Sequence, residues 1–392
     1  MTKKRGNNEG SITHRSDGRW MGRYTVQTAQ GPKRKILYGK TRAEVAAKLT
    51  KAMANRDVGL VFDGKNLTVE QYLDRWLSDC VRSSVRVSTF DRDSYLVRVH
   101  IKPALGRIKL SELSPVHVQG FYRDRLDTGL SASTVNKIHT VLHKALSQAV
   151  RWSLVSRNPA EAVKAPRPVP KEMRLLSPEE TRRFLQAAHG DRLEALYVLA
   201  VTTGMRRGEL LGLKWADIDL KGGAVSIRRT LSRTHNGKRI VLGEPKTRKS
   251  RRTIRLTSRA LIALKAHRKR QLEEMMKLAG LRQDQGLVFT TEAGSLINPS
   301  NLRQRSFAPL LKKASLPHVR FHDLRHTCAT LLLSQNTHPT FVQELLGHAN
   351  IAITLDTYSH VVPGMGNHTA RAMEDALEKQ TKDKNEEDAS EK

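Results

Sequence analysis

Near its N-terminus the chain alternates between apolar and polar residues with the two-residue period of β-strands. Arg19–Val26 and Lys35–Tyr38 show this alternation. A capping box, Thr41-Arg42-Ala43-Glu44, then predicts a helix that runs to about Arg56. Residues 1–58 are therefore predicted to form a three-stranded sheet with one helix. Their aromatic residues fit a small core better than platforms for stacked bases.

From residue 66 to 158 the apolar positions follow a helical period instead. A capping box at Thr68–Gln71 predicts a helix through Trp76, Ser88 is placed to cap a second helix, and Ser114-Pro115 begins a third that ends near Gly129. A fourth helix is indicated by a single apolar stripe, made of Val135, Ile138, Leu142, Ala145, Leu146 and Ala149. The segment is predicted to be an all-helical domain.

Prolines mark the end of this helical domain. Pro159, Pro166, Pro168 and Pro170 follow one another closely, and each fixes its backbone angle and lacks an N–H donor. Residues 159–174 are therefore predicted to be a stiff, extended linker.

A further domain is predicted over residues 175–370. Ser177-Pro178-Glu179-Glu180 is a capping box with proline at the first helical position, and helical stripes continue to Leu213. Helices return after three short predicted strands, Ala224–Arg229, Arg239–Leu242 and Arg251–Leu256. Residues 371–392 are predicted to be a C-terminal helix and acidic tail. The expected fold is mainly α with small β-sheets, and its last large domain is mixed α+β.

Positive charge is the strongest feature of the composition. The 392 residues include 69 Lys and Arg against 38 Asp and Glu, a net charge of +31, although the last twenty residues are acidic. Such an excess predicts a polyanionic partner. Nucleic acid is favoured over anionic lipid because no amphipathic basic helix flanks a membrane anchor.

The remaining composition argues against secretion and membrane insertion. No apolar run approaches the roughly 18 residues of a membrane helix, and no signal-peptide core follows the basic start of the chain. Cys80 and Cys328 are too isolated to suggest a disulfide framework or a cysteine-based zinc site. We expect a cytoplasmic protein without a membrane partner.

Four short stretches of the last large domain carry candidate chemistry. They are Thr203–Leu210, the basic run Pro245–Arg252, His322-Asp323-Leu324-Arg325-His326, and Leu346–Asn350 with Tyr358 following it. The basic run is predicted to be a turn between two strands. In this order they resemble the active-site set of the tyrosine recombinase (phage integrase) family. Each stretch alone is weak evidence, whereas the complete ordered set is specific.

The resemblance implies a site-specific DNA recombinase that integrates phage or mobile-element DNA through a covalent 3′-phosphotyrosine. It implies that residues 1–58 bind arm sites, residues 66–158 bind core sites and residues 175–370 are catalytic. Four protomers would synapse two double-stranded attachment sites in the bacterial nucleoid, with an accessory DNA-bending or directionality factor as a further candidate partner. The implied catalytic set is Arg206, Lys246, His322, Arg325, His348 and the nucleophile Tyr358.

These residue types suit phosphoryl transfer without a cofactor. Arg206 and Arg325 can each donate hydrogen bonds in fork geometry to the nonbridging phosphate oxygens. A phenol can store the bond energy as a phosphotyrosine, so neither nucleotide nor metal is expected. His322 is suited to accept the phenol proton or to hold the phosphate, His348 to add a donor, and Lys246 to protonate the leaving 5′-oxygen.

Other interpretations of the same residues remain open. Arg206 and Glu209 could form an ordinary helix ion pair, and Lys246 could be one more phosphate contact in a basic region. His322 and His326 have the spacing of a helical zinc site, but Arg325 between them would oppose a dication, and His326 fits a helix-packing role. A DNA-binding regulator without activity would have the same charge. Integration is favoured over resolution or inversion by the N-terminal domain.

Overall fold

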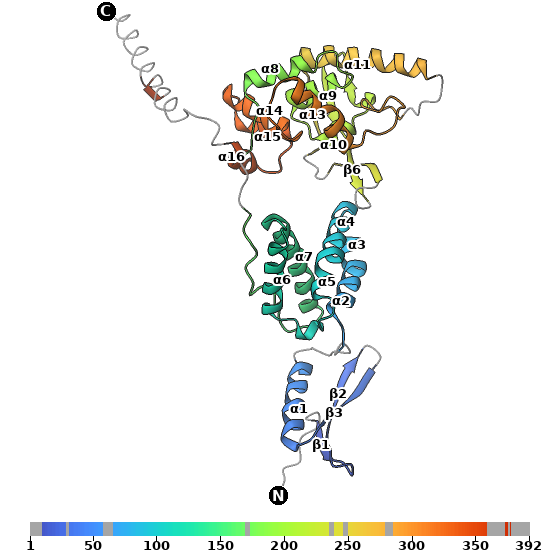
Figure 1. The fold of residues 1–392 in the computed structure, drawn as a ribbon, viewed down its shortest axis with the longest axis vertical. Helices are drawn as coiled ribbons and strands as arrows, with labels where there is room; N and C mark the ends of the chain where they lie inside the picture. The colour runs from blue at the N-terminus through green and yellow to red at the C-terminus, as the bar shows by residue number, and fades with distance from the viewer. Residues whose placement is uncertain are drawn as a thin grey trace, which may run out of the picture. The chain divides into compact units, whose positions relative to one another are not determined.

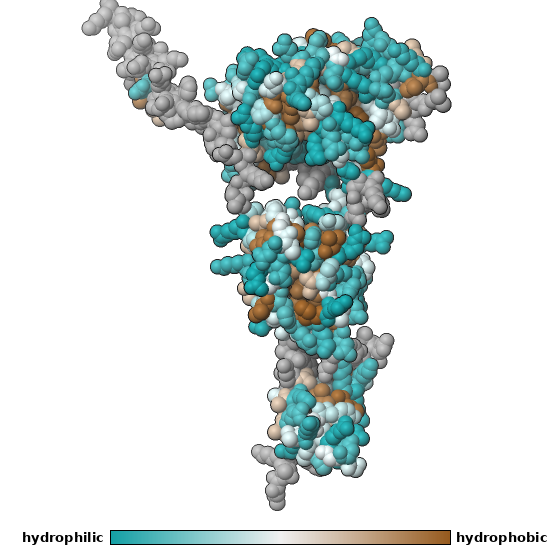
Figure 2. Space-filling model, viewed as in Figure 1, coloured by the Kyte–Doolittle hydropathy of each residue, from teal (hydrophilic) through white to brown (hydrophobic). Residues whose placement is uncertain are grey.

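The chain forms two compact units, Met1–Pro170 and Lys171–Lys392. The computed structural model describes residues 10–28, 31–57, 66–168, 173–234, 239–245, 250–278, 285–358, 373–374 and 377. Helices predominate and the sheets are small, which confirms the predicted fold class (Figure 1). Hydrophilic residues cover most of the face of each unit that Figure 2 shows.

The predicted N-terminal sheet and helix are present in the first unit. Their bounds are β1 (Ser11–His14), β2 (Trp20–Thr28), β3 (Gly31–Gly39) and α1 (Arg42–Asp57). The strands pair antiparallel in that order, and Tyr24, Val26 and Leu49 form a core between sheet and helix. Tyr38 on edge strand β3 is 45% exposed and lies under the Arg15 guanidinium, so not every aromatic residue joins the core.

The predicted helical module follows in the same unit. Its elements are α2 (Val69–Trp76), the π-helical turn η1 (Leu77–Val81), α3 (Arg82–Ser84), α4 (Val87–Leu96), the π-helical turn η2 (Val97–Ile101), α5 (Lys102–Leu105), the 3-10 turn η3 (Leu110–Glu112), α6 (Pro115–Asp127) and α7 (Ala132–Arg151). The predicted caps at Thr68 and Ser114 are present, and the whole apolar stripe of α7 is buried. The sequence was sufficient to predict these caps because each cap residue forms its hydrogen bond within the first turn of its own helix.

Two details of this module differ from the prediction. Ser88 does not cap α4, because the helix begins at Val87 with Arg86 as its N-cap residue. Residues 159–163, the predicted start of the linker, form turns and are not extended. Just before them, Asn158 donates hydrogen bonds to the His143 carbonyl and to Ser147 Oγ at 3.1 and 2.9 Å. Ala160 and Val163 thereby pack into the helical core.

The second unit is mixed α and β, as predicted. Its elements are α8 (Pro178–Ala187), α9 (Glu194–Thr203), α10 (Arg207–Leu211), η4 (Trp215–Asp217), β4 (Ile218–Asp219), β5 (Ala224–Ile227), β6 (Thr230–Thr234), β7 (Arg239–Gly243), β8 (Arg252–Arg255), α11 (Ser258–Lys277), α12 (Pro299–Asn301), η6 (Leu302–Phe307), α13 (Ala308–Lys313), α14 (Asp323–Ser334), α15 (Pro339–Leu346) and α16 (Ile351–Tyr358). The capping box at Ser177 opens α8 as predicted.

The strands pair differently from what the sequence suggested. The predicted strand Ala224–Arg229 ends at Ile227, and a second strand, β6, begins at Thr230. Among the described residues, β4, β5 and β8 form one antiparallel sheet, while β6 pairs with β7 in another. The basic run after β7 therefore joins two different sheets and does not turn between paired strands.

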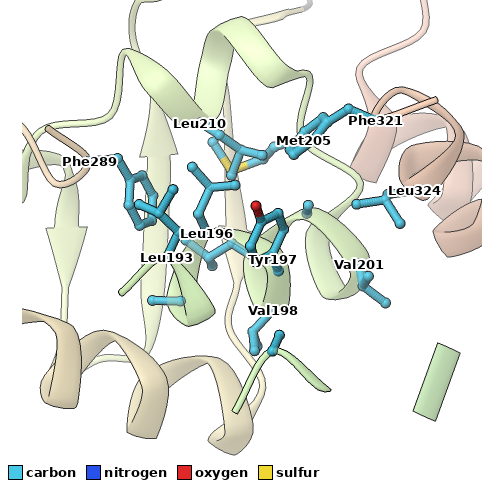
Figure 3. Close-up of a cluster of buried hydrophobic side chains, with 14 of the residues drawn as sticks. Leu193, Leu196, Tyr197, Val198, Val201, Met205, Leu210, Phe289, Phe321 and Leu324 are labelled. Atoms are coloured by element: carbon cyan, nitrogen blue, oxygen red, sulfur yellow. The ribbon is translucent and has the colours of Figure 1, made fainter. Parts of the chain in front are cut away.

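A single large core supports the second unit. α9 is buried along nearly its whole length, and its side chains form one cluster with Met205, Leu210, Phe321 and Leu324 (Figure 3). Met205 directly precedes Arg206, and Leu324 directly precedes Arg325. The core thus fixes the backbone next to both predicted catalytic arginines.

The described part of the chain contains no helix that is long and apolar enough to cross a membrane. Of the predicted C-terminal helix and tail, only Met373, Glu374 and Leu377 are among the described residues, and the side chains of Met373 and Leu377 are exposed.

Candidate active site

Arg206 is held at the junction between α9 and α10. Gly204 ends α9 in the left-handed conformation, with φ 58°, and Arg206 becomes the N-cap residue of α10. The Glu209 carboxylate accepts hydrogen bonds from Arg206 N at 3.0 Å and from Arg206 Nη1 at 2.8 Å. Arg206 Nη2 lies 3.4 Å from the Gly347 carbonyl oxygen. The ion pair between Arg206 and Glu209 that their i, i+3 spacing suggested is therefore present, and it orients the Arg206 guanidinium.

Glu209 also binds a second arginine that the sequence did not single out. Arg252 on β8 donates from Nη2 to Glu209 Oε2 at 3.1 Å and from Nε to the Leu345 carbonyl at 2.6 Å. Burial alone would raise the pKa of Glu209, but Arg252 and Arg206 outweigh it and lower the pKa. Glu209 therefore stays ionised and ties α10 to β8. We name Arg206, Arg252 and Arg325 the arginine cluster.

Arg325 is the most deeply buried member of the arginine cluster, at 2% exposure. Its Nη1 donates to the Gly204 carbonyl and its Nη2 to the Leu346 carbonyl, each at 2.8 Å. Burial, followed by repulsion from Arg206, lowers the pKa of Arg325 to about 9, so it is still charged at neutral pH. The two predicted catalytic guanidiniums thus meet at the turn after α15.

His348 lies on the same turn. Gly347 ends α15 in the left-handed conformation with φ 66°, which brings the next residue back toward the arginine cluster. His348 Nδ1 hydrogen-bonds to Thr354 Oγ1 at 2.9 Å, which leaves Nε2 for a substrate. Burial, followed by Arg325 and Arg206, lowers the pKa of His348 to about 4.

His322 precedes α14 and lies beside the same cations. Its ring packs edge-on against that of His326, with centroids 5.1 Å apart. Desolvation, followed by His326 and Arg325, lowers the pKa of His322 to about 4 although the residue as a whole is exposed. Both His322 and His348 are therefore neutral at pH 7 and can accept a proton or donate a neutral hydrogen bond.

Tyr358 ends α16 and is 1% exposed. Its ring lies in a small apolar cluster with Ala329, Leu333, Val342 and Leu346. Its hydroxyl oxygen is 2.7 Å from His326 Nδ1. Burial raises the pKa of the phenol to about 12, although nearby Arg325 acts in the opposite direction. At neutral pH the phenol therefore keeps its proton.

Lys246 lies outside the described residues, so its role stays a prediction. The residues at each end of its segment, Pro245 and Ser250, are both buried. Two residues after Ser250, Arg252 is bonded to Glu209.

Among the residues that the structure describes, His322 and His326 gain no third side chain that could complete a zinc site. Asp323 binds Arg320, whose N and Nη2 lie 2.7 and 2.8 Å from its carboxylate oxygens. Within the described ranges, no three His, Cys, Asp or Glu side chains are placed to hold a metal ion together.

Known families match both the helical module and the second unit. The phage integrase family matches residues 174–364, and the integrase N-terminal SAM-like domain matches residues 68–126. A XerC-like tyrosine recombinase of Caldanaerobacter subterraneus subsp. tengcongensis is 33% identical over 359 residues, which is 87% of this chain and 92% of the relative. The chain belongs to the phage integrase family.

Other integrases are similar over most of the chain. The ICEBs1 integrase of Bacillus subtilis is 27% identical over 77% of this chain and 81% of its own length. A Tn1549 transposon integrase in complex with circular intermediate DNA shares the fold with a TM-score of 0.65 at 22% identity, over 80% of this chain and 100% of that one. A lambda integrase tetramer bound to a Holliday junction has a TM-score of 0.55 at 20% identity, over 90% of this chain and 96% of that one.

The integrase should not tolerate a side chain at Gly208, between Arg206 and Glu209. A Cβ atom there would lie 2.5 Å from Thr230 Oγ1 and 2.6 Å from the Leu231 carbonyl oxygen. Gly208→Ala should destabilise folding by about 1–3 kcal/mol through this overlap and displace α10 with its arginine. Denaturant unfolding and covalent-adduct formation would measure the two effects.

Gly120→Ala is the matched control, because a Cβ atom at Gly120 in α6 would meet no atom within 4 Å. Its helical position favours alanine by roughly 0.5–1 kcal/mol, so no loss is expected. Equal stability and activity of the two variants would contradict the predicted overlap.

Proposed function

We propose that this integrase is a site-specific DNA recombinase that cleaves and rejoins strands to integrate phage or mobile-element DNA. The observation that carries the proposal is the meeting of Arg206, Arg325 and His348 at one turn, close to the buried phenol of Tyr358. Two guanidiniums suit the two nonbridging oxygens of a phosphodiester, whose charge grows in a five-coordinate transition state.

The proposed reaction needs only groups of the protein and the DNA. Tyr358 gives its phenol proton to a histidine of the site, its oxygen forms a bond to phosphorus, the bond from phosphorus to the 5′-oxygen breaks, and a 3′-phosphotyrosine results. Lys246 gives the leaving 5′-oxygen its proton. Attack by another 5′-hydroxyl reverses these steps and rejoins the strand. Because the arginine cluster neutralises charge and the phosphotyrosine keeps the bond energy, we propose that neither metal nor nucleotide is needed.

Recombination of two sites requires more than one copy of the chain. We propose a homotetramer on double-stranded attachment sites in the bacterial cytoplasm, with an accessory DNA-bending or directionality factor as an additional partner. The fold shared with a lambda integrase tetramer on a Holliday junction supports this assembly. The net charge of +31 supports a DNA partner.

A covalent-trapping assay tests the proposed chemistry. The full-length protein is incubated, with EDTA present, with attachment-site duplexes that carry a nick, so that the cleaved strand cannot be rejoined. A protein–DNA adduct that survives a denaturing gel is expected. Specific binding without any adduct would favour a regulator that lacks the reaction, and an adduct formed only after divalent metal is restored would contradict the cofactor-free mechanism.

Deleting residues 1–58 should separate cleavage from integration. These residues fold around their own core of Tyr24, Val26 and Leu49, and they lie outside the two matched family regions. The truncated protein should still cleave a short core-site duplex while integration on full attachment sites collapses. Both activities are measured on the same preparation, and circular dichroism verifies folding. A folded truncation that cannot cleave core sites would contradict independent arm-site binding.

A further inference from the structure

His326 is the residue in contact with the reacting atom of Tyr358. Its Nδ1 lies 2.7 Å from the phenol oxygen, and the two ring centroids are 5.7 Å apart with planes inclined by 53°. His326 lies on α14, directly after Arg325 and one helical turn after His322. The sequence suggested only a packing role for it.

The other two histidines of the site have different neighbours. His348 Nδ1 is bonded to Thr354, and the ring of His322 packs against the ring of His326. Within the described residues, neither of them is hydrogen-bonded to the phenol oxygen. Of the three imidazoles, the one placed to receive the phenol proton directly belongs to His326.

The surroundings of His326 keep it neutral at neutral pH. Burial lowers its pKa, and of the charged groups around it Asp323 raises the pKa while Arg325 and Arg320 lower it. Three further titratable groups lie near His326, namely His322, His348 and Tyr358. A neutral imidazole with its proton on Nε2 presents a lone pair at Nδ1, which is the atom that faces the phenol.

We propose that His326 is the general base that takes the proton of Tyr358, a role that rests on the recombinase function proposed above. The phenol O–H bond breaks as the Nδ1–H bond forms, and the oxygen bonds to phosphorus while the bond to the 5′-oxygen breaks. The 5′-oxygen receives its proton from the separate acid. In the rejoining step the His326 imidazolium returns the proton to the departing phenolate. His322 is then left to contact the phosphate.

The test uses the full-length protein with His326→Asn, which keeps a polar atom near the Nδ1 position but cannot accept the proton. Single-turnover adduct formation on nicked duplexes should fall by about 10²–10⁴-fold near pH 7. In the variant the rate should rise about tenfold per pH unit up to the pKa of the phenol, because only phenolate then attacks. Wild-type rates should vary much less over the same range.

A more acidic nucleophile supplies the second measurement. A fluorinated tyrosine at position 358, whose phenol ionises at lower pH, should restore most of the rate of His326→Asn. His189→Asn, at an exposed histidine paired with Glu194, is the control and should react like wild type at every pH. Circular dichroism and DNA binding verify that each variant is folded.

The possible failures are distinguishable. If wild type forms no adduct, the proposed function fails before His326 is tested. If wild type reacts and His326→Asn reacts equally fast, the base is another group. If the loss in His326→Asn is the same at every pH and fluorinated tyrosine does not relieve it, His326 positions Tyr358 without taking its proton, and the inference is overturned.

Discussion

Tyr358→Phe is expected to abolish covalent adducts while leaving the fold and DNA binding intact. The change removes the nucleophilic oxygen and keeps the ring in its cluster with Ala329, Leu333, Val342 and Leu346. The folded state loses one hydrogen bond, to His326, at a cost of about 1 kcal/mol. Denaturing gels of reactions with nicked duplexes measure the adduct. Thermal unfolding measures the stability of the fold, and binding assays measure the affinity for DNA.

Tyr197→Phe is the matched control for this prediction. Tyr197 is also fully buried (Figure 3). Its hydroxyl is bonded to Ser306 Oγ at 2.5 Å. This variant should lose a similar amount of stability and keep adduct formation. An adduct that persists in Tyr358→Phe and maps to another tyrosine would move the nucleophile assignment.

Lys246→Ala is expected to slow cleavage of ordinary DNA by about 10²–10⁴-fold, because an alkoxide is a poor leaving group without a proton. Replacing the bridging 5′-oxygen by sulfur creates a leaving thiolate that is stable near neutral pH. The variant should therefore cleave the sulfur substrate almost as fast as wild type does. Single-turnover rates on the two substrates measure the difference.

Two further variants separate this role from phosphate binding. Arg206→Ala should lose about 3–4 kcal/mol of transition-state stabilisation on both substrates, because its targets are the nonbridging oxygens, which the sulfur does not change. Lys249→Ala should show a weaker, salt-sensitive binding defect with either substrate. Equal impairment of Lys246→Ala on both substrates would mean that the lysine only holds phosphate, and the acid would have to be sought elsewhere, first at His322.

Features set by local sequence could be predicted from it. The caps at Thr68, Ser114 and Ser177 bond within their own first turns, and the stripe of α7 repeats every helical turn. The ordered set of catalytic residue types could be found because each lies in a short, recognisable stretch.

Contacts between distant elements could not be predicted in the same way. Arg252 lies in a basic run in which the sequence does not distinguish it from its neighbours. Its role in holding Glu209 follows from a contact between residues that are 43 positions apart in the sequence. His326 resembled a packing residue because its partner, Tyr358, follows 32 residues later on another helix. The break between β5 and β6 was not predicted, because the two residues that form it, Arg228 and Arg229, are not among the residue types that usually form turns.

The buried ends of the segment that carries Lys246, Pro245 and Ser250, bear on its predicted role as the acid. Lys246 directly follows Pro245 in the sequence. Ser250 closes the segment next to Arg252 and Glu209. A group confined by such a short tether has an effective concentration in the millimolar range or above. Free amines added to a Lys246→Ala reaction would have to reach at least that concentration before they could replace it.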